Sequence, residues 1–130
     1  MKNLNLLYKE KKIKNKKNNV TLIIKSTLNN ILVSAVKKDG DLLFWTSSSV
    51  EKFKGKQKRS NFAAFQCALT TSLKLRKLGY SNVNIKFNGI NRSRNAIIRS
   101  LIKSGISIDK LSDNTSIPHN GCRLKKKRRK

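Results

Sequence analysis

The sequence predicts an α/β domain on a mixed sheet of about five strands, with the element order βββαβαβ. Three short segments rich in β-branched and aromatic residues come first, and turn residues separate them. Two longer segments follow, with apolar residues three and four positions apart, and each precedes a further short apolar segment. At 130 residues, the chain has room for one such domain with tails.

The first three strands are expected to form an antiparallel meander. Residues 20–25 and 31–36 are nearly continuous apolar runs, which are typical of strands covered on both faces in the interior of a sheet. Ser, Thr and Asn in 26–30 supply the turn between them. An Asp-Gly pair at 39–40 then predicts a hairpin that leads into the third strand at 42–45.

A basic loop and a helix are expected next. Residues 46–59 combine lysines, serines and a glycine without any usable periodicity, which indicates a loop. Ser60 suits the N-cap of a helix that runs to about Leu78, and Gly79 suits its left-handed C-terminal cap. The buried face is predicted to be the stripe of large apolar residues at three- and four-residue spacing, namely Phe62, Phe65, Leu69 and Leu73. Cys67, on this helix, is expected to be a small buried apolar residue.

Residues 83–111 have the length of one βαβ unit. Alternating apolar and polar residues at 83–87 predict a half-covered strand, and a final strand starts at 106–109. The helix between them is expected from about Arg94 to Ser104. Its side toward the sheet is predicted to consist of Ile98, Leu101 and Ile102. The two strands should be parallel, with a right-handed crossover.

The charge of the chain is large and positive, because 31 Lys and Arg residues face six Asp and Glu, giving +25. Residues 1–19 contain seven Lys and one Glu, and residues 123–130 contain seven basic residues and no acid. Residues 20–122 keep 17 basic and five acidic residues, or about +12 (17 − 5). Such a charge repels itself strongly unless a polyanion neutralises it, so nucleic acid is the expected partner. We therefore expect a disordered basic arm at 1–19, a nucleic-acid-binding α/β domain at 20–122 and a basic tail at 123–130.

Several other classes of protein fit the composition poorly. No apolar segment approaches the roughly 18 residues needed to span a bilayer, and no basic amphipathic helix is present, so a membrane partner is not expected. The N-terminus lacks a signal-peptide core. Cys67 and Cys122 form no CxxC pair, and with a single His there are too few ligands for a zinc site, so no metal or cofactor is expected.

Near the C-terminus stands the segment Ile117-Pro-His-Asn-Gly-Cys-Arg123, followed by the basic tail. Pro118 and the Asn120-Gly121 pair predict a tight turn beside the cationic tail. The plain alternative is a surface turn ahead of a disordered tail. His119 is expected to contact RNA rather than to act as a catalyst.

This segment with its tail resembles the terminal signature of the universal small-subunit ribosomal protein eleven family, in its bacterial and organellar form. The resemblance extends over about 20–130. It includes Ser26 with Asn29-Asn30, the Gly40 turn leading to Trp45, Phe53-Lys54-Gly55, and Phe62-Ala63-Ala64 at the helix start. One loop departs from the family. A sequence similar to Gly-Pro-Gly-Pro-Gly-Arg is usual before the second helix, whereas residues 89–94 read Gly-Ile-Asn-Arg-Ser-Arg.

The resemblance implies a three-layer α/β/α domain of the ribonuclease-H-like type on the platform of the small ribosomal subunit. It implies a structural role in translation, binding to small-subunit rRNA near the mRNA exit, and contacts with neighbouring platform ribosomal proteins and with mRNA near the exit channel. No small-molecule substrate is expected. The departure at 89–94 favours the mitochondrial matrix, with the plastid stroma or bacterial cytoplasm as alternatives.

Three groups of residues are expected to contact RNA. The lost glycines at 89–94 should be compensated by arginine side chains, since a guanidinium can grip a phosphate at two points. Phe53 could stack on a base or tuck under its own loop, and Trp45 is expected in the core. The full set is Lys52, Phe53, Lys54, Gly55, Lys56, Lys58, Arg59; Gly89, Arg92, Arg94; and His119, Asn120, Gly121, Arg123, Lys125, Lys126, Lys127, Arg128, Arg129, Lys130.

Two other functions are alternatives to a ribosomal one. Ribonuclease-H-like folds often hold catalytic metal ions on clustered carboxylates. The acids outside the arm are scattered, and no Gly-rich phosphate-binding motif is present, so no catalytic residue is expected. They are Asp39, Asp41, Glu51, Asp109 and Asp113. A free-standing basic RNA- or DNA-binding protein outside the ribosome is the alternative that charge leaves open, although the match at 117–123 favours the ribosome.

Overall fold

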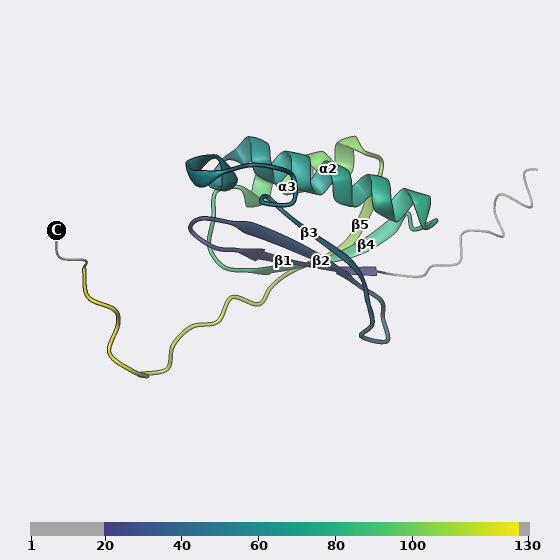
Figure 1. Cartoon of the computed structure of the whole chain (residues 1–130). Coiled ribbons are helices and arrows are strands. Elements are labelled where there is room, and N and C mark those ends of the chain that lie inside the picture. The colour runs from purple at the N-terminus through teal and green to yellow at the C-terminus, as the bar shows by residue number, and fades with distance from the viewer. Residues whose placement is uncertain (1–19, 128–130) are drawn as a thin grey trace, which may run out of the picture.

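The computed structural model describes residues 20–127, in which two α-helices lie against a five-stranded mixed sheet (Figure 1). The predicted arm at 1–19 and the last three residues of the predicted tail, 128–130, lie outside the described residues. The predicted α/β class, the mixed five-stranded sheet and the order βββαβαβ are confirmed.

The strands are β1 (Val20–Ser26), β2 (Ile31–Val36), β3 (Leu42–Ser47), β4 (Asn82–Asn88) and β5 (Ser107–Asp113), in the spatial order β3-β2-β1-β4-β5. The first three form the predicted antiparallel meander. The hairpin at 39–40 is closed by a 2.8 Å hydrogen bond from the Lys37 amide to the Asp41 carbonyl, and Gly40 has a φ of 97°. β4 pairs in parallel with both β1 and β5, as the βαβ prediction requires.

The helices are the short 3₁₀ helix η1 (Gly55–Arg59), α2 (Asn61–Lys77) and α3 (Arg94–Lys103). The Ser60 hydroxyl accepts a 3.1 Å hydrogen bond from the Ala63 amide, so the predicted N-cap is confirmed. Gly79 has a φ of 83° just after α2, as its predicted capping role requires. The sequence did not predict η1, because its Lys-rich residues have no apolar pattern.

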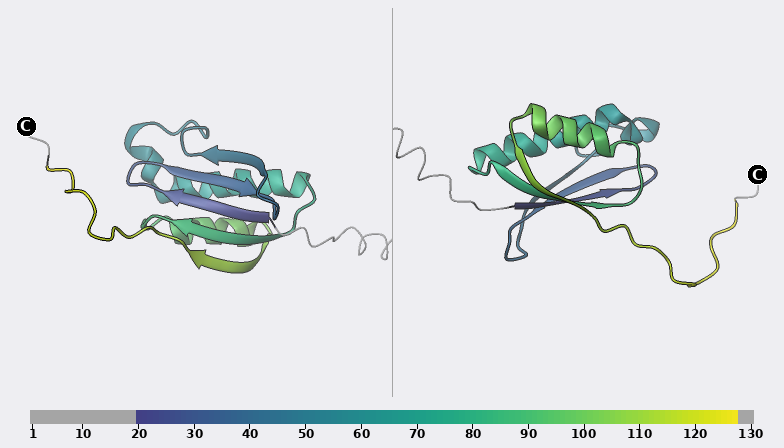
Figure 2. Two further views of the ribbon diagram at one scale, coloured as in Figure 1. Left: turned by 90° about the horizontal axis from the view of Figure 1, so that it is seen from below. Right: turned by 180° about the vertical axis from the view of Figure 1, so that it is seen from behind.

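Both α2 and α3 lie on the same face of the sheet, as the front view in Figure 1 and the view from behind in Figure 2 show. The reason is topological. The connections from β3 to β4 and from β4 to β5 join parallel strands and run in the same direction across the sheet, and crossovers of one hand then lie on one face. Within residues 20–127, both helices therefore cover the same face of the sheet.

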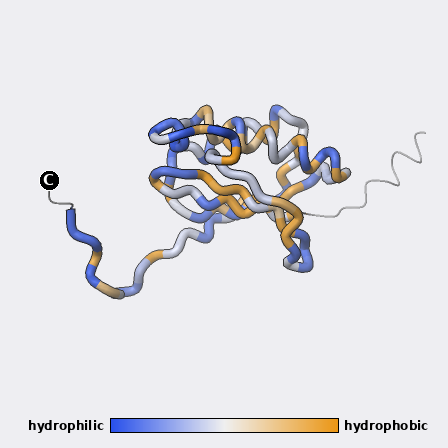
Figure 3. The backbone as a smooth tube through the Cα atoms, in the orientation of Figure 1, coloured by the Kyte–Doolittle hydropathy of each residue, from blue (hydrophilic) through white to orange (hydrophobic). Residues whose placement is uncertain are grey.

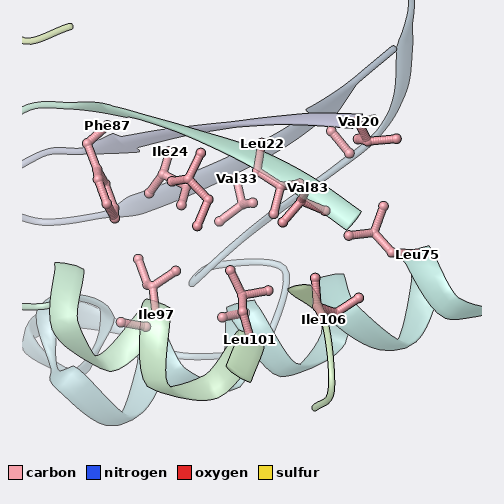
Figure 4. Packing of buried hydrophobic residues seen from close by; sticks show 14 of the residues in the cluster. Val20, Leu22, Ile24, Val33, Leu75, Val83, Phe87, Ile97, Leu101 and Ile106 are labelled. Carbon is pink, nitrogen blue, oxygen red and sulfur yellow. The ribbon is translucent and has the colours of Figure 1, made fainter. Parts of the chain in front are cut away.

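The core lies between this face and the helices. Side chains from alternate strand positions point at the helices, and Leu22, Ile24 and Val83 are completely buried (Figure 4). The other face of the sheet has no such cover. Ile23 is 39% exposed there and Lys25 is exposed, so the prediction that β1 is covered on both faces is wrong.

Trp45 lies on the uncovered face, and the prediction that it belongs to the core is wrong. It is 54% exposed. Its register partner on β2 is Ser34, which pairs in turn with Ile23, whereas Phe44 pairs with the buried Ala35. The alternation of side chains along β3 therefore turns Trp45 away from the helices.

The predicted buried face of α2 is also wrong. Phe62 and Leu73 are 66% and 51% exposed, and Phe65 and Leu69 are half-buried. The buried positions are mostly small: Ala63, Ala64, Cys67, Ala68, Thr71, Ser72 and Leu75. Small side chains let a helix approach both the sheet and a neighbouring helix closely, and such a stripe contributes little to an amphipathic pattern.

Two further predictions concern single buried residues of the helices. On α3, Leu101 is buried as predicted, but Ile97 is the second buried apolar residue, Ile98 is half-buried and Ile102 is 60% exposed. Cys67 is completely buried, as predicted. Burial raises the pKa of its thiol to about 11.

Candidate nucleic-acid interface

The basic loop and the 89–94 turn meet at one edge of the sheet, and the C-terminal tail starts there. β2 is antiparallel to both β1 and β3, and β4 and β5 are parallel to β1, so β1, β3, β4 and β5 all point the same way. We call the end of the sheet at which these four strands have their carboxyl termini the carboxyl edge. The loop follows β3, the turn follows β4 and the tail follows β5, so all three leave from this edge.

The base of the loop is fixed by buried hydroxyl groups. Thr46, Ser47 and Ser48 are buried at the end of β3. The Thr46 hydroxyl donates to a carboxylate oxygen of Glu51 at 3.2 Å, and the Phe53 amide donates to the Ser48 carbonyl at 3.1 Å. Glu51, one of the few acids in the chain, is thus engaged inside the loop base and does not neutralise the lysines beyond it.

The tip of the loop presents its cations to solvent. Its basic side chains are exposed apart from the half-buried Lys58, and they are Lys52, Lys54, Lys56, Lys58 and Arg59. Within residues 20–127 there are two ion pairs, Lys37 with Asp41 at 3.8 Å and Arg94 with Asp113 at 2.8 Å, and neither involves the loop. The loop therefore offers five positive charges that its own domain does not pair.

Phe53 tucks against its own domain in this structure. Its side chain is half-buried, and its ring lies edge to face with Phe62 of α2, with ring centres 5.9 Å apart and planes at 84°. Such a pair stabilises a structure by roughly 0.5–1.5 kcal/mol beyond its burial. Of the two interpretations left open for Phe53, the geometry favours packing under the loop.

The 89–94 turn is packed against the chain itself. Gly89 has a φ of 95°, and a Cβ at this position would collide with the backbone carbonyl oxygen of Ser26 at the end of β1. Its amide donates a 3.1 Å hydrogen bond to the Thr115 hydroxyl. The glycine that the chain shares with the resembled family is therefore needed for close packing of two backbone segments.

Arg94 holds this turn from inside. Its guanidinium pairs with the Asp113 carboxylate at 2.8 Å, donates from Nε to the Gly89 carbonyl at 3.1 Å, and donates to the Thr115 hydroxyl at 3.1 Å. It also lies over the Phe87 ring, 5.1 Å from the centre. The structure thus places this predicted phosphate contact in an internal network.

The pKa of Asp113 reflects the same network. Its carboxyl pKa is lowered from 3.8 to about 2, first by hydrogen bonds from the Thr115 side chain and then by those from Arg94. Both partners stabilise the ionised carboxylate. The carboxylate is therefore ionised at neutral pH and keeps Arg94 in place.

Arg92, two residues earlier, is exposed and takes part in neither ion pair of the described chain. It lines a cleft of about 530 Å³ between the N-terminal parts of α2 and α3, which we call the interhelix cleft. The lining residues are Asn61, Phe62, Phe65, Arg92, Asn95, Ala96 and Arg99. Sequence reasoning missed Phe65 and Arg99 as cleft-lining residues, because Phe65 was assigned to the core and Arg99 lies in mid-helix.

The 117–123 segment does not form the predicted tight turn. The chain bends at His119 and Asn120, and Asn120 has a φ of 50°, but no backbone hydrogen bond closes a turn among these described residues. Residues 116–127 are exposed and extend away from the domain, as Figures 1 and 3 show, and the tube is mostly hydrophilic toward its end. The tail is anchored only up to Thr115.

The described residues give little support for a metal site or a membrane-spanning helix. Within 20–127, no three His, Cys, Asp or Glu side chains gather into a group that could hold a metal ion. Asp109 accepts a 3.1 Å hydrogen bond from the Asn82 side chain, and Asp113 is paired with Arg94. None of the helices in this part of the chain is both long and apolar enough to cross a membrane.

Comparison with known proteins gives a consistent match. The sequence profile of the family described as ribosomal protein S11 matches residues 20–129. The small ribosomal subunit protein uS11 of Neorickettsia sennetsu is 39% identical over 103 residues, which cover 79% of this chain and 86% of the relative. The uS11c protein of Oltmannsiellopsis viridis is 39% identical over 82% of each chain. The uS11 of Desulfotalea psychrophila is 34% identical over 93% of this chain and 96% of its own length.

Proposed function

Since the chain belongs to the ribosomal protein S11 family and is a structural, non-enzymatic constituent of the small ribosomal subunit, we propose that the carboxyl edge of its sheet binds rRNA. One observation carries this proposal: the basic loop, the 89–94 turn and the basic tail all leave the domain at that edge. As part of the subunit, the protein assembles with small-subunit rRNA and other ribosomal proteins.

The groups at the edge have different roles in this proposal. The loop lysines, Arg59 and the tail from Arg123 onward neutralise phosphates and release condensed counterions, which gives affinity without reading sequence. His119, Asn120 and Gly121 contact RNA where the tail leaves the domain. Gly89 and Arg94 shape the turn, so that its backbone and Arg92 meet the RNA in a fixed geometry. Specificity then comes from the shape of the folded rRNA.

The finer placement rests on the family resemblance. We place the protein on the platform near the mRNA exit, with platform proteins and mRNA as neighbours. The domain that does this spans residues 20–122, flanked by an arm at 1–19 and a tail at 123–130. The mitochondrial matrix is our first choice of compartment because the 89–94 loop departs from the usual pattern. The plastid stroma and bacterial cytoplasm are the alternatives, and the similar proteins are of bacterial and plastid type.

A free-standing nucleic-acid-binding role has no supporting observation in the fold or the comparisons. It predicts that the protein follows bulk nucleic acid and washes off in high salt. Membership of the ribosome predicts stable co-sedimentation with the small subunit.

The interface is tested by charge removal at the edge. Lys54, Lys56 and Lys58 are changed together to Gln, and the salt dependence of binding to small-subunit rRNA is measured. Each lost phosphate contact should reduce the magnitude of the log–log slope by about 0.7–0.9, so a reduction of about 2.1–2.7 is expected for the triple variant. Incorporation into reconstituted subunits should fall in parallel.

A matched control removes three exposed charges elsewhere. Lys38 lies in the β2–β3 hairpin, and Lys77 and Lys103 lie at the C-terminal ends of the two helices, all at the opposite edge. The triple change to Gln should leave the slope nearly unchanged. Equal effects of the two triple variants would show that net charge, rather than the carboxyl edge, determines binding.

A further inference from the structure

We propose that the interhelix cleft binds one unpaired nucleotide of the RNA, with the base against Phe62 and Phe65 and a phosphate on Arg92 and Arg99. The inference rests on the proposed rRNA-binding function and adds a specific subsite to it. The cleft lies where α2 and α3 begin, which is the carboxyl edge from which the loop, turn and tail emerge.

The cleft is a built feature of the fold. Its walls are the first turns of two helices that pack side by side, as Figure 2 shows. The Ser100 hydroxyl of α3 donates a 2.9 Å hydrogen bond to the Phe65 carbonyl of α2, which fixes the spacing of the helices next to the cleft. Its volume of about 530 Å³ falls within the range of about 300–1,000 Å³ that is usual for small-ligand sites.

The aromatic side chains of the cleft are held but not covered. Phe53 contacts the Phe62 ring edge to face and restrains it from the loop side, yet Phe62 stays 66% exposed. Phe65 is half-buried in the adjacent wall. An exposed aromatic ring whose position is fixed loses little entropy when a base stacks on it.

The polar lining selects an anion that also carries hydrogen-bonding groups. Arg92 and Arg99 are exposed, and no acidic side chain lines the cleft or lies in the first turn of α2 or α3. Asn61 and Asn95 add carboxamides that can bond the edges of a base. Arginine with aromatic rings is the combination that recognises unstacked bases in single-stranded RNA.

The occupant is therefore a splayed-out nucleotide rather than a duplex. A paired helix presents mainly phosphates and sugars, which would use the arginines but leave both phenylalanines exposed to water. An acidic protein segment would satisfy the arginines but would bring no planar group to the rings. An unpaired nucleotide uses both the arginines and the phenylalanine rings of the lining.

The test uses the full chain and two RNA probes of equal length. One is a single-stranded adenine decamer with a central 2-aminopurine, whose fluorescence falls on stacking, and the other is a ten-base-pair RNA duplex. Phe62→Leu and Phe65→Leu keep apolar volume but remove the stacking surface. Each should weaken binding of the single strand about 5- to 140-fold, as expected from the loss of one base stack, and leave duplex binding unchanged.

Control variants match these changes outside the cleft. Trp45→Leu removes an exposed aromatic ring from the uncovered face of the sheet, and Arg76→Gln removes an exposed guanidinium from the other end of α2. Both should bind the single strand like the unmodified protein. The exposed Arg92→Gln and Arg99→Gln variants repeat the test with no aromatic change, in case a Phe variant does not fold as judged by circular dichroism.

The outcomes separate the subsite from the wider function. If the cleft variants weaken the single strand no more than their controls, or if the Phe variants weaken the duplex as much as the single strand, the subsite is overturned while rRNA binding through the loop stands. Displacement of the decamer by a ten-residue polyglutamate at equal concentration would also overturn it, in favour of an acidic protein partner. Failure of the unmodified protein to bind small-subunit rRNA would instead overturn the proposed function itself.

Discussion

The basic loop and the 89–94 turn leave the same edge of the sheet, yet they use their charged residues in opposite ways. The loop keeps its acid, Glu51, at its base and leaves its lysines in solvent. The turn directs its last arginine inward, where Arg94 meets Asp113. Whether a cation at this edge is free to pair with an outside anion therefore depends on where the nearest carboxylate lies.

The internal packing of the 89–94 turn also explains why one glycine is enough there. The resembled family has three glycines in the corresponding loop, and this chain keeps one, Gly89. That one is the position where the backbone passes close to Ser26 with a positive φ. The remaining positions carry side chains, of which Arg92 lines the interhelix cleft.

The largest effect is expected from Gly89→Ala, which breaks the turn from inside. The added Cβ collides with the Ser26 carbonyl, and the left-handed backbone is itself costly for alanine. Together these should lower the free energy of unfolding by about 2–4 kcal/mol, measured by urea denaturation. Gly121→Ala is the control, since a Cβ there meets nothing within 4 Å, and it should change stability by less than about 0.5 kcal/mol. Similar losses for both would refute the packing role of Gly89.

The next largest effect on stability distinguishes Arg94 from Arg92, the two arginines of the turn. Arg94→Gln removes hydrogen bonds to the Gly89 carbonyl and the Thr115 hydroxyl, and should lower the free energy of unfolding by about 1–2 kcal/mol. Arg92→Gln, at an exposed position, should leave stability within about 0.5 kcal/mol but weaken RNA binding. Thermal melts and rRNA titrations on both variants test this pair. An unstable Arg92 variant beside a stable Arg94 variant would reverse the assignment.

The smallest effect is a pH dependence confined to the turn. The Asp113 pKa is lower in the folded chain, about 2, than its ordinary value of 3.8, so the ionised carboxylate stabilises the fold. This contribution is fully present above about pH 4 and is lost as the pH falls toward 2. Asp113→Asn should therefore be less stable than the unmodified chain at neutral pH, with the difference shrinking between pH 4 and 2. A difference that is constant over this range would contradict the assignment.

Sequence reasoning located the elements of the edge but not the use of each side chain. The loop at 46–59, the helix starts at Ser60 and Arg94, and the strand before Gly89 were all predicted, because turns, caps and apolar alternation depend on near neighbours. The surroundings of Phe62 and Arg94 were not predicted: Phe62 was assigned to the core but is exposed, and Arg94 forms an ion pair with Asp113 that the sequence did not indicate.

What the sequence determined by itself is therefore the order of the elements, their ends and the positive charge of the segments that follow the strands. Only the tertiary structure decided which faces are covered. Two crossovers in the same direction put both helices on one face, which left Trp45 in solvent and turned the small residues of α2 inward. Burial and pairing of this kind depend on partners far along the chain, as Gly89 depends on Ser26, and no local pattern encodes such distant contacts.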